Sequence, residues 1–182
     1  MKNLLDCLDE LTQLLEAEKI SYVVMGGIAV RVYGIPRATY DLDFTLSLPR
    51  SELPRLYDLL ESKGYTVPDS YRKGWVDKVA EMPLVKCRVY LEGHGIDLDF
   101  FLAESSFQNS VMQRKRREQV NGCTVWLVTP EDLILLKLIA NRDRDRADIG
   151  DVLFTQGTLD RTYLEKWAAE LGVRKRLEAV LT

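Results

Sequence analysis

Two short segments of this 182-residue chain carry aspartates at alternate positions, and they limit what the chain can fold into. Asp41 and Asp43 flank one leucine, and Asp97 and Asp99 flank another. Because side chains two residues apart on a β-strand share a face, each segment predicts a strand with two carboxylates on one face and a leucine turned towards the core. If the two strands are neighbours, four carboxylates converge. Their mutual repulsion predicts a site for divalent cations with oxygen ligands, Mg²⁺ first among them.

The composition is that of a globular protein and excludes several other classes. Hydrophobic residues make up 46% and charged residues 29% of the chain, and the net charge of -3 provides no overall positive field for nucleic acid. Cys7, Cys87 and Cys123 are widely separated and form no zinc-binding or disulfide pattern. No apolar run has the length of a membrane span, and acidic residues occur too early for a secretory signal. We therefore expect a cytoplasmic protein with no membrane partner.

Hydrophobic periodicity predicts an α/β (α+β) protein, with helices and strands interspersed along the chain. In the first part, an apolar strand over residues 21–25 is expected to break at Gly26 and Gly27 and to lead into a short helix that Gly34 stops. A half-buried strand over 40–48 follows. The other elements predicted for this part are a helix over residues 4–19 and a helix from a Ser51 cap to Gly64.

The second part of the sequence predicts two hairpins and then a helical segment. Thr129 is a typical helix N-cap, because Pro130 follows it and acids occupy the first turn. We expect one domain over residues 1–182, with a core of about 20–128 and a helical segment of about 129–182. The elements predicted here are strands between residues 84 and 102 joined by a hairpin at 92–95, a polar helix over 105–117, a hairpin at 121–122, a strand over 123–128, a helix over 133–140, and two or three helices from 148 to 181.

These features together resemble the nucleotidyltransferase superfamily, whose fold is shared with DNA polymerase β. The superfamily is marked by a Gly-Gly or Gly-Ser turn, a pair of acids further along the chain and a third acid on a later strand. Here Gly26 and Gly27 supply the turn, and Asp41 and Asp43 supply the pair. The resemblance implies a nucleotidyltransferase-like mixed β-sheet flanked by helices, and a metal-dependent enzyme that binds a nucleoside triphosphate such as ATP.

The resemblance also implies a role for each residue at the site. Asp41 and Asp43 would hold the metal, expected as two Mg²⁺ ions with Mn²⁺ as an alternative, for an in-line displacement. Asp99 is favoured as the third carboxylate and metal ligand, while Asp97 stays open as an auxiliary ligand or as the third acid itself. The residues expected to contact the nucleotide or its phosphates are Gly26 and Gly27 through backbone N–H groups, together with Arg37, Thr39 and Lys137.

Three further stretches resemble the AbiEii-like bacterial nucleotidyltransferases, namely residues 34–39, 129–137 and 142–148. With the site motifs, the resemblance covers about residues 20–155. It implies an RNA, particularly a tRNA end, or a protein hydroxyl as the acceptor, and a toxin with a cognate antitoxin as its partner. The sequence indicates neither the oligomeric state nor the base of the triphosphate.

Other interpretations stay open at this stage. The chain could be a binding or regulatory module that keeps the fold without turnover, or a nucleotidyltransferase for a small molecule of the aminoglycoside type. Lys137 could bind phosphate or lie along the core with its amine in water. The charged run 142–148 could be an exposed, self-neutralising helix start, and the basic run 114–117 could follow an RNA backbone or be solvated.

Overall fold

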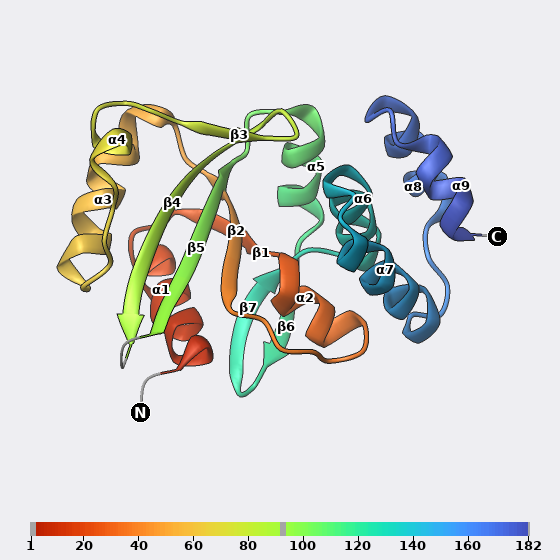
Figure 1. Ribbon diagram of the computed structural model, residues 1–182, viewed down its shortest axis with the longest axis horizontal. Coiled ribbons are helices and arrows are strands. Elements are labelled where there is room, and N and C mark those ends of the chain that lie inside the picture. The colour runs from red at the N-terminus through yellow and green to blue at the C-terminus, as the bar shows by residue number, and fades with distance from the viewer. Residues whose placement is uncertain (1–2, 92–93, 182) are drawn as a thin grey trace.

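A seven-stranded mixed β-sheet with helices packed around it makes up the described part of the protein (Figure 1). The computed structural model describes residues 3–91 and 94–181. The strands are β1 Ser21–Val24, β2 Asp41–Ser47, β3 Asp77–Val79, β4 Met82–Leu91, β5 His94–Leu102, β6 Arg116–Val120 and β7 Cys123–Leu127. They lie in the order β3-β4-β5-β2-β1-β7-β6, so the two acidic strands, β2 and β5, are neighbours.

The helices divide into those packed on the sheet and a group at the end of the chain. They are α1 Leu4–Ala17, α2 Gly26–Tyr33, the 3-10 helix η1 Arg50–Glu52, α3 Leu53–Ser62, α4 Asp69–Arg72, α5 Ser106–Arg114, α6 Pro130–Ala140, α7 Asp143–Thr155, α8 Arg161–Glu170 and α9 Arg174–Leu181. Helices α1 and α5 contact β1 and β2, whereas α2 contacts β2, α6 and α7. Figure 1 shows α6 to α9 gathered on one side of the sheet. Helix α2 thus connects the acidic strand to the C-terminal helices.

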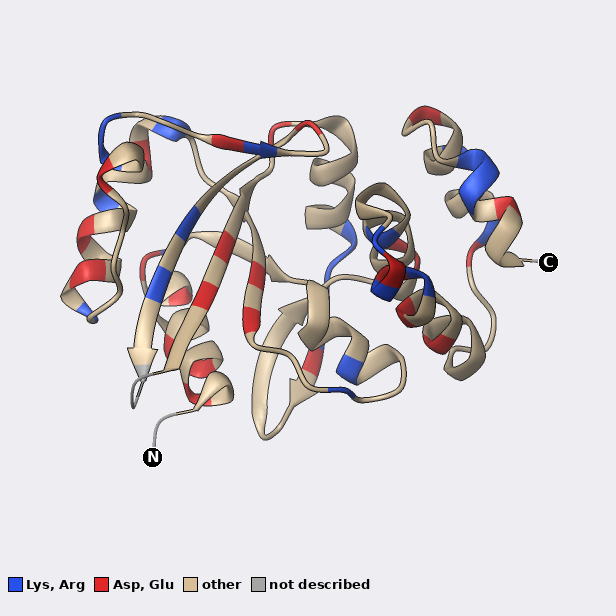
Figure 2. Ribbon diagram, in the orientation of Figure 1, with Lys and Arg blue, Asp and Glu red and all other residues tan. Residues whose placement is uncertain are grey.

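The predicted convergence of the acidic strands is confirmed by their register. Strands β2 and β5 run parallel, with Asp41 opposite Asp97 and Asp43 opposite Asp99. The leucine between each pair of acids is fully buried, which shows that the carboxylates share the opposite face. Figure 2 shows the acidic bands of the two strands side by side in the middle of the sheet.

The C-terminal helices follow in the predicted order, although α7 begins at Asp143, earlier than the predicted start at residue 148. The Thr129 side chain accepts a hydrogen bond from the backbone N–H of Asp132, and Pro130 occupies the first turn of α6. Asn141 ends α6 in a left-handed conformation (φ 52°), so that the chain reverses into α7 within two residues. The breaks near Gly157 and Gly172 separate α7, α8 and α9 as expected.

Two predicted helix boundaries are wrong, and one predicted hairpin lies partly outside the described residues. Ser51 makes no capping bond because it lies within η1, and α3 begins after it at Leu53. The helix predicted over 105–117 ends at Arg114, because the next residues pair with β7 as strand β6. The hairpin predicted at 92–95 falls on residues 92–93, which lie outside the described ranges. Within those ranges, no helix has the length and apolarity needed to cross a bilayer.

Candidate active site

The turn between β1 and α2 brings the Asp43 carboxylate against the start of α2. Gly26 has φ +61°, and a Cβ atom at this position would lie 1.8 Å from Asp43 Oδ2. The backbone N–H of Met25 donates a hydrogen bond to the carbonyl oxygen of Asp43 (2.9 Å), which joins the turn to β2. Glycine is therefore needed at position 26 both for the left-handed backbone and for the space that the carboxylate occupies. The sequence suggested only that a glycine would leave room for phosphate.

The second glycine makes room for the residue that orients Asp41. A Cβ atom on Gly27 would lie 2.2 Å from Thr39 Oγ1. Thr39 is buried, and its hydroxyl donates a hydrogen bond to Asp41 Oδ1 (2.6 Å). The sequence predicts a nucleotide contact for Thr39. In the structure this hydroxyl is engaged in positioning an exposed carboxylate next to Asp43.

Asp43 is the electrostatic centre of the site. Burial, followed by the negative charges of Asp41 and Asp99, raises the pKa of Asp43 to about 7, while Arg142 and Lys137 act in the opposite direction. The nearby cations thus do not compensate for the burial and for the two other carboxylates. A carboxylate with so high a pKa is typical of a functional site that lacks a positive charge.

The donor set fits a hard divalent cation. Asp41 and Asp43 present carboxylate oxygens from one face of β2, and oxygen is the ligand that Mg²⁺ and Mn²⁺ prefer. Across residues 3–91 and 94–181, no three acidic, histidine or cysteine side chains already form a metal-binding group. The third acid of the site, Asp99, accepts a hydrogen bond from Lys86 Nζ (3.1 Å). Lys86 thus competes with a metal ion for the Asp99 carboxylate.

The two aspartates of β5 differ in how firmly they are held. Both oxygens of Asp97 accept hydrogen bonds from the Arg88 guanidinium, one of them at 2.9 Å, and these bonds lower the pKa of Asp97. Asp99 has one bond to a lysine, and burial raises the pKa of its carboxyl above the ordinary value. A bidentate arginine pair is harder to open than a single lysine contact. Asp99 is thus the acid of β5 that is more available.

A buried ion-pair network behind the site involves two residues predicted to bind phosphate. Lys137 is 5% exposed, and its amine donates to Asp145 Oδ1 (3.1 Å) and to Asp148. Arg37 Nε and Nη2 donate to the two oxygens of Asp148, both at 2.7 Å. The alternative with the Lys137 amine in water is wrong, as is an exposed position for Asp145 and Asp148, which are both 1% exposed. This network connects the loop before β2 to α6 and α7.

Arg142 is a site residue that the sequence analysis missed. Its side chain is 73% exposed, and its Nε donates to Asp145 Oδ2 (2.8 Å). Its charge lowers the pKa of Asp43, and it lines the same cavity as Gly26 and Asp43. The position at the start of α7, three residues before an acid, was visible in the sequence. The alternation of charges alone indicates a self-neutralising run, and the proximity of Arg142 to Asp43 comes from the packing of α6 and α7, which join distant parts of the chain.

Two cavities meet at Asp99. The first, of about 320 Å³, lies between the sheet and α6, and the second, of about 450 Å³, lies over β4 and β5. Asp99 and Lys86 line both cavities. The first cavity has a polar end formed by Gly26, Asp43 and Arg142 and an apolar wall that includes Leu133, Leu136 and Ile139. An apolar wall beside a polar end suits a ligand with a flat apolar part and a charged part.

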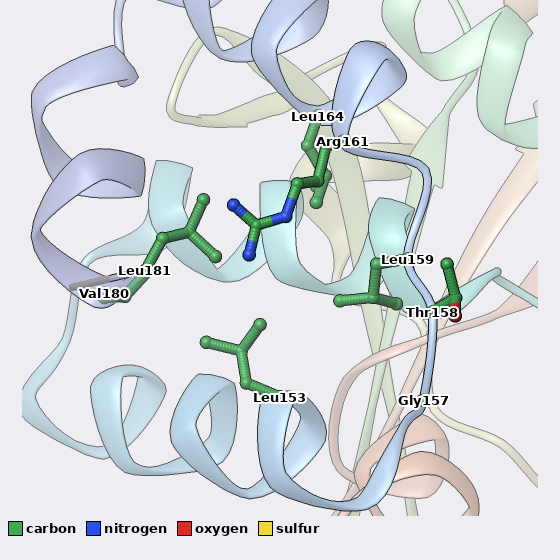
Figure 3. Close-up of a pocket in the computed structure, with 8 residues that line it drawn as sticks. All are labelled: Leu153, Gly157, Thr158, Leu159, Arg161, Leu164, Val180 and Leu181. Atoms are coloured by element: carbon green, nitrogen blue, oxygen red, sulfur yellow. The ribbon is translucent and has the colours of Figure 1, made fainter.

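A third cavity lies among the C-terminal helices and has a different character. It measures about 370 Å³, and half of the eight residues that line it are leucines, which come from α7, α8, α9 and the loop between α7 and α8 (Figure 3). Arg161 is the charged residue among these eight. None of its lining residues comes from β2 or β5. It is therefore separate from the carboxylate site.

The basic run 114–117 is largely engaged within the fold. Arg114 stacks on the Tyr163 ring at 3.8 Å and pairs with Glu131 at 3.2 Å. Lys115 donates to the hydroxyl of Ser21 (2.7 Å) and also to the backbone oxygen of Tyr22. These contacts engage Arg114 and Lys115 within the fold. A structural role therefore explains these two cations better than contact with an RNA backbone.

Comparison with known proteins agrees with this geometry. Residues 2–176 match the family described as "Nucleotidyltransferase of unknown function (DUF6036)". The chain belongs to this nucleotidyltransferase family. No curated protein matches the sequence of this family member closely enough to count as a relative. The finer resemblance to AbiEii-like proteins stays a prediction, because the family description does not include it.

Solved structures show the same fold at low sequence identity. An antigenic nucleotidyltransferase-like protein from Paracoccidioides brasiliensis is 20% identical, with a TM-score of 0.54 over 96% of this chain and 90% of that one. Lincomycin-bound LnuA, a lincosamide antibiotic adenylyltransferase, is 18% identical, with a TM-score of 0.53 over 82% and 96%. ANT(2")-Ia in complex with adenylyl-2"-tobramycin is 13% identical, with a TM-score of 0.61 over 93% and 97%. At these identities the comparison supports the fold and leaves the acceptor open.

Proposed function

We propose that this family member is a Mg²⁺-dependent enzyme that transfers a nucleoside monophosphate from a nucleoside triphosphate to an acceptor hydroxyl. The observation that carries the proposal is the pairing of β2 with β5, which places Asp41 and Asp43 beside Asp99 at the Gly26 turn. The high pKa of Asp43 supports it, because the site has more negative charge than its own cations balance.

Asp41 and Asp43 are assigned as the metal ligands, and Asp99 as the third carboxylate. Bound Mg²⁺ ions would clamp the attacking and leaving oxygens and stabilise their developing charge. Asp99, which borders the second cavity, is assigned to receive the proton of the acceptor hydroxyl. The acceptor oxygen bonds to the α-phosphorus, the bond from that phosphorus to the pyrophosphate oxygen breaks, and pyrophosphate leaves. Asp97 is assigned no ligand role, because Arg88 holds both of its oxygens.

The nucleotide is assigned to the cavity between the sheet and α6. Its apolar wall would hold the base, and the Gly26 turn at the start of α2 would face the phosphates. Arg142 is the preferred phosphate-binding cation, since most of its side chain is exposed and one edge of its guanidinium is fixed by Asp145. Arg37 and Lys137 are better explained as positioning residues, because their donors are directed at Asp148 and Asp145.

The AbiEii-like resemblance implies an RNA or tRNA end, or a protein hydroxyl, as the acceptor. It also implies a toxin that a cognate antitoxin controls. Both are hypotheses. A small-molecule acceptor is the second candidate, and two of the structures with the same fold are antibiotic-modifying enzymes. The third candidate is a binding module, which would bind a nucleotide in the same cavity without transferring it to an acceptor.

The test is incubation of the purified protein with each α-labelled nucleoside triphosphate, Mg²⁺ and one of three kinds of acceptor: RNA, protein or a small hydroxyl compound. Asp43→Asn and Asp99→Asn should abolish labelling. Asp97→Asn is the matched control, because it makes the same change on the same face of β5 and should retain most of the activity. Triphosphate binding without label on any acceptor would favour the binding module.

A further inference from the structure

Three neighbouring strands carry two parallel rows of charge, each consisting of a cation and two acids. Strand β4 runs antiparallel to β5 with Lys86 opposite Asp99 and Arg88 opposite Asp97, and each β5 acid lies opposite an acid of β2. Figure 2 shows the basic bands of β4 next to the acidic bands of β5 and β2. The row that contains Asp43 thus ends in a lysine.

The two rows respond differently when the acids of the site are engaged. Arg88 keeps Asp97 as its partner, because Asp97 has no assigned role in catalysis and accepts through both oxygens. Lys86 loses the negative charge opposite it when Asp99, which a single lysine contact holds, takes the proton of the acceptor hydroxyl. Lys86 Nζ would then be an unpaired ammonium, with a side chain that is 47% exposed, at the boundary between the two cavities.

The cavity over β4 and β5 has a rigid wall and an aromatic rim. Thr66 and Arg88 exchange backbone hydrogen bonds of 2.6 and 3.0 Å, which attach the segment between α3 and α4 to the edge of the cavity. The hydroxyl of Tyr71 donates to Asp77 Oδ2 (2.6 Å) and is therefore held in place. Tyr90, which is 62% exposed, contributes an aromatic ring to the lining. A volume of about 450 Å³ suits a molecule of the size of a sugar phosphate or a mononucleotide.

Charge decides which acceptor this cavity favours. With Asp99 engaged, the ionised side chains left in its lining are Lys86, Arg88 and Asp97, a net charge of one positive unit. A polycationic acceptor of the aminoglycoside type finds no free carboxylate there and is repelled. An acceptor with an anionic group near its hydroxyl gains the ion pair that Lys86 has lost.

We propose, on the basis of the proposed function, that the cavity over β4 and β5 is the acceptor site and that Lys86 selects an acceptor whose hydroxyl lies near a phosphate. The hydroxyl lies at Asp99, the phosphate binds Lys86, and an attached ring stacks on Tyr90. A free sugar phosphate or nucleotide and the terminal nucleotide of an RNA share this chemistry.

The experiment compares acceptors that differ in charge and size, each with an α-labelled triphosphate and Mg²⁺. The acceptors are ribose, ribose 5-phosphate, a nucleoside monophosphate, a short oligoribonucleotide and an aminoglycoside. Ribose 5-phosphate should be labelled in preference to ribose and to the aminoglycoside. Labelling of the oligoribonucleotide alone would assign the phosphate to an RNA end, and labelling of the small compounds would assign it to a free metabolite. Preference for the aminoglycoside would overturn the proposal.

Lys86 variants separate this proposal from the proposed function. Lys86→Met should raise the KM for ribose 5-phosphate at least tenfold relative to the KM for ribose, and Lys86→Arg should restore most of the preference. Lys78→Met, on exposed β3, is the matched control and should behave like the wild type. An equal loss with ribose and ribose 5-phosphate in Lys86→Met would refute selection by Lys86 and leave nucleotidyl transfer intact. Absence of label on every acceptor with the wild type would refute both proposals.

Discussion

Replacing Asp43 with asparagine should stabilise the metal-free protein at the same time as it abolishes transfer. Burial and the neighbouring carboxylates raise the pKa of Asp43 from 3.8 to about 7, so the folded chain holds this proton more tightly than the unfolded chain does. Because a tenfold difference in proton affinity corresponds to about 1.4 kcal/mol, ionised Asp43 lowers the free energy of unfolding by up to about 4 kcal/mol at pH 8.

The sign of this effect defines its pH window. Below pH 3.8 the carboxyl is protonated in both states and there is no penalty, and between 3.8 and about 7 the penalty grows as the pH rises. About 2 kcal/mol of it is present at pH 5. Asparagine carries no charge at any pH, so Asp43→Asn should gain more stability at pH 8 than at pH 5. A gain of 1 kcal/mol raises the Tm of a chain of this length by about 2–4 °C, which predicts an increase of roughly 8 °C or more at pH 8.

The assay is urea unfolding in the presence of a chelator at pH 5 and pH 8, with tryptophan fluorescence as the readout. Asp97→Asn is the control, because its pKa is lowered by Arg88 and its substitution should cost up to about 1 kcal/mol. Addition of Mg²⁺ at pH 8 should stabilise the wild type and leave Asp43→Asn unchanged. A gain for Asp43→Asn that is equal at the two pH values, or a loss at pH 8, would refute the reasoning.

Two further predictions concern the turn and the cation of the nucleotide cavity. Gly26→Ala should lower transfer at least about a hundredfold, since the new Cβ displaces Asp43. The control Gly64→Ala, also at positive φ but with open space around it, should cost only about 1 kcal/mol of stability. Equal effects of the two substitutions on activity would contradict this explanation. Arg142→Ala should raise the KM for the triphosphate about tenfold, the equivalent of about 1.4 kcal/mol, and leave the KM for the acceptor unchanged. The control is Arg144→Ala, a substitution of an exposed arginine on α7, which should leave both KM values unchanged. A larger effect on the acceptor than on the triphosphate would move the nucleotide to the other cavity.

The acidic strands and the faces of their side chains could be predicted from the sequence because they depend on a local rule, whereas the pairing of β2 with β5 was only a condition of the prediction. Alternation with period 2 decides which side chains share a face, and the burial of Leu42 and Leu98 leaves only one face for the acids. Thr129 and Pro130 define the start of α6 in the same local way. Positions that follow from short-range stereochemistry were therefore accessible without the structure.

The partners of the charged residues could not be predicted, because they come from distant parts of the chain. Arg37 and Asp148 are 111 positions apart, and only the packing of α2 on α7 brings them together. The choice between Asp97 and Asp99 depends on which β4 cation lies opposite each acid, and the register of β4 is not readable from its own sequence. The predicted helix over 105–117 is too long for the same reason, because the residues after Lys115 pair with β7 and form strand β6.

The buried ion pairs behind the site have a consequence for biosynthesis. Asp41 and Asp43 leave the ribosome about a hundred residues before Arg142, so a half-made sheet holds its carboxylates together without the cations of α6 and α7. The contacts that anchor Arg37 to Asp148 are among the longest in sequence separation, and such contacts form late. We therefore expect the cavity between the sheet and α6 to form only when α6 and the start of α7 dock on the sheet.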